Sequence, residues 1–214
     1  MANNSSCLLP EVRGFVEDRL TELDGIPVER QTVLSTLTDF IAGKMASGQP
    51  SRLVFICTHN SRRSHMAQLW AQVAAEVFSV PDVETFSGGT EATAFNPRAV
   101  SALRRAGFVI DPFTDGKNPI YEVSFEEGME PMQAFSKVFD HAPNPADGFA
   151  AVMTCTSADA ACPVVEGADK RITIPYDDPK AHDCTEQEAA KYDERCAHIA
   201  REMLWVFSEV TRKA

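Results

Sequence analysis

The residues from Cys57 to Ser64 carry the strongest chemical signal in the sequence. They read CTHNSRRS and lie between a short apolar run ending at Cys57 and a segment with apolar residues at helical spacing. In a tight turn before a helix, successive backbone N–H groups form a concave site for an oxyanion, and the helix N-terminus adds partial positive charge. The pattern therefore predicts an anion-binding loop that opens a helix.

Three side chains of this loop are suited to chemistry on a tetrahedral anion. Arg63 offers a planar fork of donors to two of its oxygens. The same positive field stabilises the Cys57 thiolate, the nucleophilic form of cysteine, and the Ser64 hydroxyl is placed to hydrogen-bond that sulfur. The residues expected to complete the oxyanion-binding loop are Thr58, His59, Asn60, Ser61 and Arg62.

Two other interpretations of the loop are open. Cys57 could be a buried residue at a strand end, with Arg63 a surface charge. Alternatively, Cys57 could bind a metal with His59 and His65. Metal binding would bury the nucleophile, and no second cluster with ligand spacing supports it. We therefore expect no metal site there.

An acidic partner for the loop is expected at Asp178. The segment Tyr176-Asp-Asp-Pro179 follows a short predicted strand. A loop carboxylic acid near a leaving oxygen serves as general acid and then as general base. Asp178 is favoured because the following proline restrains its backbone toward an extended form. An acidic turn without chemistry is the alternative.

A pair of cysteines, Cys155 and Cys162, follows another predicted strand. If the segment is helical, the two residues are about 10.5 Å apart along its axis, whereas a disulfide needs Cα atoms within about 7 Å. A disulfide would therefore require this short segment, cut off by Pro163, to unwind. Two buried apolar thiols are the alternative. The other three cysteines, expected to be structural or incidental, are Cys7, Cys184 and Cys196.

Strands alternating with helices position these residues. The predicted strands are 52–57, 83–86, 149–154 and 171–174, with 120–125 and 134–139 as further candidates in a proline-rich insertion at about 111–148. A turn is expected at 87–90. Asn96-Pro97 opens one predicted helix, and a capping box from Thr185 to Glu188 opens the last one. This alternation predicts an α/β domain at 51–214 with a doubly wound, mostly parallel sheet. Residues 1–50 are expected to add a helical hairpin.

Composition excludes several classes of partner. The 214 residues include 20 basic and 31 acidic side chains, giving a net charge of −11. Binding of nucleic acid or anionic lipid through the overall charge of the protein is therefore not expected. Six cysteines are too few for a disulfide scaffold. The first residues show no secretory signal, so we expect a reducing, cytoplasmic setting.

The sequence resembles the low-molecular-weight tyrosine phosphatase superfamily and, within it, the thioredoxin-coupled arsenate reductases. The phosphatase-like motif is CTHNSRRS. The reductase-like motifs are SGGTEATAFNPRAV from Ser87 to Val100, VMTCTSADAACP from Val152 to Pro163, and DDP from Asp177 to Pro179. The resemblance covers roughly residues 51–212.

The resemblance implies a thiol relay. Cys57 attacks arsenate held by Arg63, and Asp178 protonates the departing oxygen. Cys155 then attacks Cys57 and releases arsenite, Cys162 moves the disulfide to Cys155–Cys162, and thioredoxin reduces it. Some family members hold a potassium ion near the loop. Asn60 and Ser87 match that site, but Gln68 stands where a carboxylate is expected.

Two other functions are open. A phosphatase acting on phosphotyrosine or a small phosphoester, through a cysteinyl-phosphate, needs neither Cys155 nor Cys162. It usually has an aromatic wall beside the acid, which only Tyr121 or Phe125 of the insertion could supply. A non-enzymatic redox-sensing module that uses the loop as an anion receptor would not need Asp178.

Overall fold

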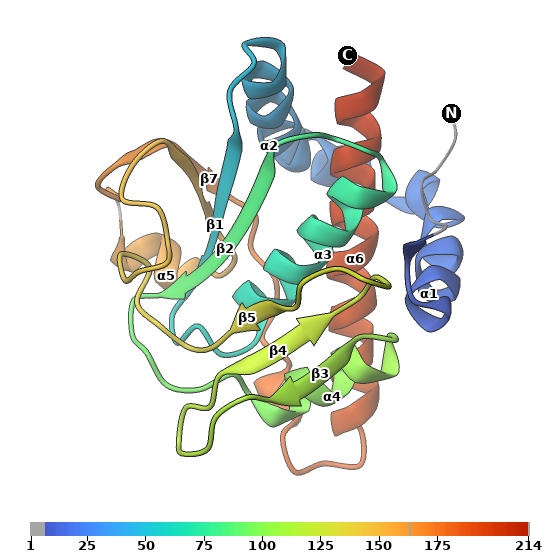
Figure 1. Cartoon of the computed structure of the whole chain (residues 1–214), viewed down its shortest axis with the longest axis vertical. Coiled ribbons are helices and arrows are strands. Elements are labelled where there is room, and N and C mark those ends of the chain that lie inside the picture. Colours follow the sequence, from blue (N-terminus) through green and yellow to red (C-terminus); the bar gives the residue numbers. More distant parts are fainter. Residues whose placement is uncertain (1–6, 163, 214) are drawn as a thin grey trace.

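A four-stranded parallel sheet forms the centre of the fold in the computed structural model, which describes residues 7–162 and 164–213 (Figure 1). Its order is β2-β1-β6-β7. The strands are β1 (Ser51–Cys57), β2 (Val83–Gly89), β6 (Phe149–Met153) and β7 (Ala168–Thr173). All three pairings are parallel. The predicted α/β class with a parallel sheet is confirmed.

Strand β1 sits between β2 and β6, and its apolar run is buried on both faces. The chain leaves β1 toward β2 on one side, while β6 joins on the other side. In open α/β sheets, ligand sites lie beyond the carboxyl ends of strands at such a switch point. Cys57 is the last residue of β1 and therefore occupies that position.

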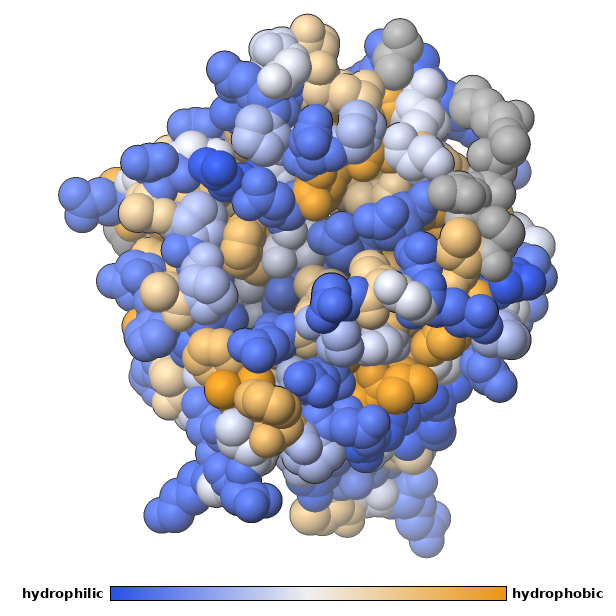
Figure 2. Space-filling view, viewed as in Figure 1, coloured by the Kyte–Doolittle hydropathy of each residue, from blue (hydrophilic) through white to orange (hydrophobic). Residues whose placement is uncertain are grey.

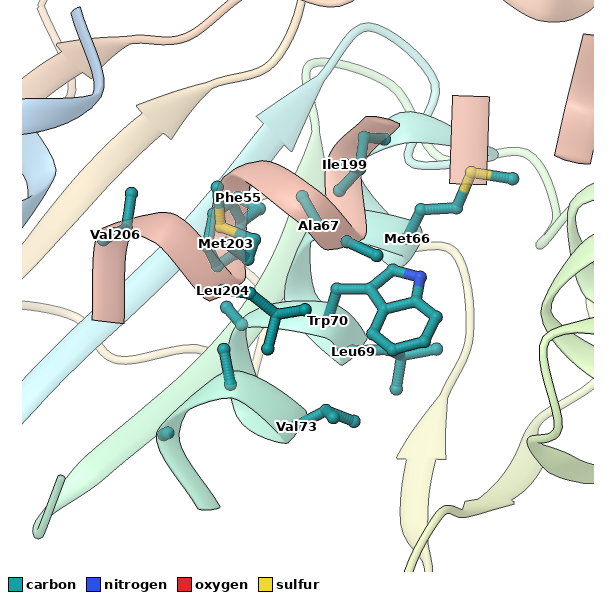
Figure 3. Close-up of a cluster of buried hydrophobic side chains, with 14 of the residues drawn as sticks. Phe55, Met66, Ala67, Leu69, Trp70, Val73, Ile199, Met203, Leu204 and Val206 are labelled. Carbon is teal, nitrogen blue, oxygen red and sulfur yellow. The ribbon is translucent and has the colours of Figure 1, made fainter. Parts of the chain in front are cut away.

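Helices lie on both faces of this sheet. α3 (Arg63–Val77) and α6 (Glu188–Lys213) lie on one face, and the short α5 (Thr156–Ala161) lies on the other. α4 (Pro97–Arg105) packs on α6, as does a short 3-10 helix, η3 (Pro179–His182). α3 packs on β1 and on α6, around the fully buried Trp70 (Figure 3). Met203 and Leu204 of α6 contribute to the same cluster.

Two N-terminal helices pack against α6 (Figure 1). They are α1 (Pro10–Leu20) and α2 (Val28–Ala46), separated by the 3-10 helix η2 (Leu23–Gly25). Leu34, Leu37 and Ile41 of α2 are fully buried at three-to-four spacing. Arg30 adds a two-pronged hydrogen-bonded ion pair to Glu202 of α6, with both N···O distances 2.7 Å. The predicted helical pair is present.

A second, antiparallel sheet differs from the prediction. It contains β3 (Val109–Pro112), β4 (Tyr121–Ser124) and β5 (Met132–Ala134) in that order. The prediction anticipated β4 but missed β3, and the predicted strand at 134–139 is wrong. The backbone of that segment instead bonds outside the second sheet: the N–H of Lys137 donates to Asn60 Oδ1 at 2.9 Å, and that of Phe139 to the Gly89 carbonyl at 3.0 Å.

Three local predictions at the ends of helices and strands have different outcomes. The Asn96 cap is confirmed, because its Oδ1 accepts from the Arg98 N–H at 2.9 Å. β2 runs to Gly89, so the turn predicted at 87–90 is wrong. The capping box is also wrong: the N–H of Thr185 donates to the His182 carbonyl at 3.2 Å, and Glu188 instead accepts from the N–H of Cys184 and pairs with Arg98 at 2.6 Å.

The surface is mostly hydrophilic, with apolar side chains in separate small patches on the face shown in Figure 2. The exposed large apolar residues among those described are Val28, Val109, Phe113 and Val164. None of the described helices has the length and apolar character needed to span a bilayer.

Candidate active site

The loop from Thr58 to Arg62 joins β1 to α3 and has its carbonyl groups bound by the scaffold. The carbonyl of Thr58 accepts from the N–H of Glu91 at 2.8 Å, and that of Ser61 from Asn96 at 2.8 Å. In a trans peptide the carbonyl and the following N–H point in opposite directions. These contacts therefore turn the following N–H groups toward the inside of the loop, as an anion site requires.

The Cys57 thiol lies in a chain of hydrogen bonds that begins in the insertion. Its Sγ is 3.1 Å from Ser64 Oγ, and Asn60 Nδ2 donates to the same oxygen at 2.9 Å. Asn60 Oδ1 accepts from the N–H of Lys137 at 2.9 Å, which fixes the amide. Because Asn60 donates to Ser64 Oγ, the hydroxyl proton of Ser64 is left to bond the sulfur.

Arg63 and Asp178 lie side by side beside this loop. Arg63 Nη2 donates to Asp178 Oδ2 at 2.6 Å, and Nη1 donates to the Tyr176 carbonyl at 3.0 Å. Arg63 Nε is buried with no partner among the described atoms. The guanidinium is thus fixed on one side and retains a free donor. An anion that binds Nη2 would compete there with Asp178.

The side chain of Arg62, which we expected to complete the oxyanion-binding loop, turns away from the anion site. Its Nε donates to the Tyr192 hydroxyl at 2.7 Å, and its Nη2 contacts Asp183 Oδ2 at 3.3 Å. The peptide group of Arg62 stays in the loop, while its side chain holds α6 and the segment after η3. The physical reason is the pair of acceptors, Tyr192 and Asp183, on that side.

The two histidines of the loop region differ in their exposure to solvent. His59 is exposed, 3.8 Å from Glu91. His65 is fully buried and stacks on Phe95 with ring centroids 4.0 Å apart. Burial, with a smaller effect of the nearby Lys137 charge, lowers the pKa of His65 to about 3. Over residues 7–162 and 164–213, no group of three or more His, Cys, Asp and Glu side chains could hold a metal ion.

Cys155 lies at the carboxyl end of β6, the strand beside β1, and faces the loop. Its Sγ is 3.5 Å from Thr58 Oγ1 and accepts from the Ala158 N–H at 3.3 Å, which caps α5. Cys162 lies at the other end of α5 and is half-buried. Both thiols are free. The segment between them is helical, which is the case in which the spacing argument requires unwinding before a disulfide can form. Pro163 lies outside the described residues.

The other cysteines have different surroundings. Cys196 is buried in α6, where its sulfur accepts from Trp70 Nε1 at 3.2 Å, and burial raises its pKa to about 12. Such a thiol is inert at neutral pH. Cys7 and Cys184 are exposed and lie outside the hydrogen bonds of the anion loop described above.

The aromatic wall that a phosphotyrosine enzyme usually has does not come from Phe125. Phe125 is fully buried in the main core, packed on Phe108. Tyr121 packs edge-on against Phe95, with ring centroids 5.7 Å apart, in the second sheet. Neither contact places a ring beside Asp178.

The donor set for the potassium ion implied by the resemblance fits poorly. Gln68 Oε1 and Ser87 Oγ are buried without a partner among the described atoms. Asn60 Oδ1, however, is engaged by the Lys137 N–H. None of the three carries a charge, and the buried Lys137, whose pKa burial lowers to about 8, adds positive charge to this region. We derive no step through a cation.

Two supports of the loop have no signal in the residue pattern. The Ser136 hydroxyl donates to the His59 carbonyl at 2.9 Å and accepts from the Thr93 N–H at 2.8 Å. Lys137 acts through its backbone, as described above. These contacts link the loop to a segment about 77 residues away in sequence. No local pattern encodes them, although the unusual burial of a lysine marks the segment in the structure.

Comparison with known proteins agrees with this geometry, although no family model matches the chain. Arsenate reductase of Bacillus licheniformis is 29% identical over 158 residues, covering 73% of this chain and 94% of that protein. Arsenate reductase 2 of Staphylococcus epidermidis is 27% identical over 131 residues, covering 59% and 77%. A low-molecular-weight protein tyrosine phosphatase from T. tengcongensis superposes with a TM-score of 0.50 at 17% identity, covering 74% and 99%. In sequence the chain is similar to bacterial arsenate reductases, and its fold is that of the low-molecular-weight tyrosine phosphatases.

Proposed function

We propose that the protein reduces arsenate to arsenite through Cys57, Cys155 and Cys162, and that thioredoxin regenerates the thiols. The observation that carries this proposal is the position of Cys155, whose sulfur contacts Thr58 of the anion loop at 3.5 Å. A second thiol, Cys162, ends the same short helix. A hydrolase needs neither thiol, and the relatives named arsenate reductase support the same choice.

The first step forms a bond between sulfur and arsenic. Backbone N–H groups of the loop and the Arg63 guanidinium hold the arsenate, and the Cys57 thiolate attacks arsenic. One As–O bond breaks, and Asp178 supplies a proton to the oxygen that leaves as water. Arsenic stays in its +5 state in this adduct.

The second step is the reduction. The Cys155 thiolate attacks the Cys57 sulfur, an S–S bond forms, and the S–As bond breaks with its electron pair left on arsenic, which leaves as arsenite. The Cys162 thiolate then attacks Cys155 and frees Cys57. The dithiol of thioredoxin reduces the Cys155–Cys162 disulfide and is itself oxidised. We place this chemistry in the cytoplasm, where thioredoxin keeps thiols reduced.

The decisive experiment mixes the purified protein with arsenate, thioredoxin, thioredoxin reductase and NADPH, beside a para-nitrophenyl phosphate assay. We expect arsenate-dependent NADPH oxidation that is lost in Cys155→Ser, while any phosphatase activity survives. Cys57→Ser should abolish both activities, because a hydroxyl is barely ionised where a thiolate is required. Cys162→Ser should stall after one turnover with a Cys57–Cys155 bridge visible by mass spectrometry.

A phosphatase is the second candidate, favoured by the Arg63–Asp178 pair at the loop. That pair would serve a cysteinyl-phosphate intermediate equally well. Phosphatase turnover without arsenate-dependent NADPH oxidation would overturn arsenate reduction in favour of hydrolysis. Neither activity would favour the redox-sensing anion-binding module.

A further inference from the structure

The short helix between the two relay cysteines is held to the neighbouring strand β7 through one carboxylate. Asp159 Oδ1 accepts from Arg171 Nη2 at 2.6 Å and from the Thr173 hydroxyl at 2.6 Å. Arg171 and Thr173 are two residues apart in a strand, so their side chains lie on the same face. Ile172 between them points to the core. Two donors from β7 therefore converge on α5.

Arg171 also binds the backbone of the helix. Its Nη2 donates to the Asp159 carbonyl at 2.5 Å, and its Nε donates to the Cys162 carbonyl at 3.0 Å. The last carbonyls of a helix have no partner within it, and a cation near them is stabilising. Arg171 thus caps the C-terminal end of α5, while Cys155 caps the N-terminal end through its sulfur. We call Asp159, Arg171 and Thr173 the α5 clasp.

The clasp exists only while α5 is folded. A six-residue helix is not stable by itself, and α5 runs only from Thr156 to Ala161. It stays folded through the burial of Ala158 and through these side-chain contacts with β7. Bringing Cys155 and Cys162 within disulfide distance requires the helix to unwind, and the bonds from Arg171 to the two carbonyls must then break.

We propose that the α5 clasp positions the two cysteines for the relay by stabilising the dithiol form over the Cys155–Cys162 disulfide. This inference rests on the relay proposed above. Arg171 and Thr173 are positioning residues, because they act on the helix and not on the substrate. The clasp keeps Cys155 at the anion loop until its thiol is consumed, and it makes the disulfide easier for an external dithiol to reduce.

The test measures the dithiol–disulfide equilibrium directly, in the full chain carrying Cys57→Ser so that Cys57 cannot pair. Oxidised dithiothreitol is the oxidant: two thiols of the protein lose two protons and two electrons, and the cyclic disulfide becomes a dithiol. The fraction with Cys155–Cys162 joined is read by thiol alkylation and peptide mass spectrometry across a series of dithiothreitol ratios.

We expect Asp159→Asn to shift the equilibrium about tenfold toward the disulfide. The charged hydrogen bonds that this substitution removes exist only in the dithiol form, so only that form is destabilised. For a two-electron couple that is a potential about 30 mV more negative. Thr173→Val should shift it the same way by a smaller factor, and Thr173→Ser, which keeps the hydroxyl, should restore the wild-type value.

Asp193→Asn is the matched control, because it removes a comparable ion pair with Arg105 far from α5. It should leave the equilibrium unchanged. An unshifted equilibrium in Asp159→Asn, or a shift toward the dithiol, would overturn the proposal, as would failure of the disulfide to form in any variant. A shift in a protein that fails to reduce arsenate would keep the clasp and reject only the proposed reduction.

Discussion

Arg62 and Arg63 are adjacent residues whose side chains have opposite tasks. Arg63 lies beside Asp178 at the anion loop, whereas Arg62 binds Tyr192 and Asp183 on α6 and the segment before it. Sequence alone identifies Arg63 by its spacing from Cys57. It cannot decide the direction of Arg62, because the acceptors that turn it away lie more than a hundred residues further along the chain.

The first prediction compares conservative changes at these two positions. Arg63→Lys should lower kcat/KM for arsenate at least about a hundredfold, because an ammonium cannot make the bidentate fork. Arg62→Lys should keep activity within a few fold and instead lower the free energy of unfolding by about 1–2 kcal/mol, since it loses bonds to partly buried partners. Steady-state kinetics and urea unfolding on both variants provide the measurement. Near-normal turnover in Arg63→Lys would contradict its role.

The second prediction concerns Asn60, which has a left-handed backbone (φ 42°) and holds Ser64. Asn60→Gly loses both hydrogen bonds of the side-chain amide, but glycine adopts the left-handed conformation without strain. Asn60→Ala loses the same hydrogen bonds and also destabilises the fold, because a left-handed conformation is unfavourable for alanine. Both should slow turnover, and Ala should be less stable than Gly by about 1 kcal/mol. Equal stability of the two variants would show that backbone strain is not important at this position.

At the scale of elements, the sequence predicted the parallel sheet, the loop and most helices from apolar periodicity and from Asn96-Pro97. In the insertion, where prolines interrupt the patterns, it anticipated β4 but missed β3 and placed a strand wrongly at 134–139. The segment from Ser136 to Phe139 has no regular structure of its own, because its hydrogen bonds go to His59, Asn60 and Gly89. Such long-range backbone contacts leave no periodic signal.

The third prediction belongs to the contact between β2 and the anion loop. A Cβ on Gly89 would lie 2.6 Å from the Asn60 nitrogen and 2.8 Å from the Thr58 oxygen, both backbone atoms. Gly89→Ala should therefore displace the loop, cost about 1–3 kcal/mol of stability and reduce turnover strongly.

The matched control for Gly89 is Gly43 in α2, around which a Cβ meets nothing within 4 Å. Gly43→Ala should raise stability by up to about 1 kcal/mol, since alanine is the better helix former, and should leave turnover unchanged. Thermal unfolding and kinetics on both variants decide the matter. A Gly89→Ala variant as active as Gly43→Ala would show that the loop does not depend on this close approach.

At the scale of the whole molecule, one line of contacts connects the N-terminal helices to the catalytic region through Arg30. Arg30 of α2 lies over the Tyr176 ring, 5.0 Å from its centroid, and pairs with the buried Glu202. The Tyr176 carbonyl in turn fixes Arg63. Sequence patterns predicted the helical pair but not this link, because nothing in the residue spacing couples Arg30 to Tyr176.

The last prediction is a pH dependence of folding that comes from His65. Its pKa is about 3 in the folded protein, against an ordinary 6.5, chiefly because it is buried. Between these values the unfolded chain binds a proton that the folded chain does not. Stability should therefore fall as pH drops from about 6.5 toward 3, by about 1.4 kcal/mol for each pH unit.

Glu202 contributes in a different pH window. Burial raises its pKa, but its hydrogen bonds to His198 and Arg30 outweigh burial and lower the value to about 2. The stabilisation that Glu202 contributes is present at pH values above its ordinary pKa of 4.5. It is lost as the pH falls from 4.5 toward about 2. Glu202 therefore contributes little to the change in stability between pH 7 and pH 5, whereas His65 contributes strongly there. His65→Phe, which keeps a planar ring against Phe95, should reduce the stability difference between these two pH values by about 2 kcal/mol in urea unfolding. The exposed His141→Gln should leave that difference unchanged, and an equally large pH effect in His65→Phe would show that the buried imidazole is not its source.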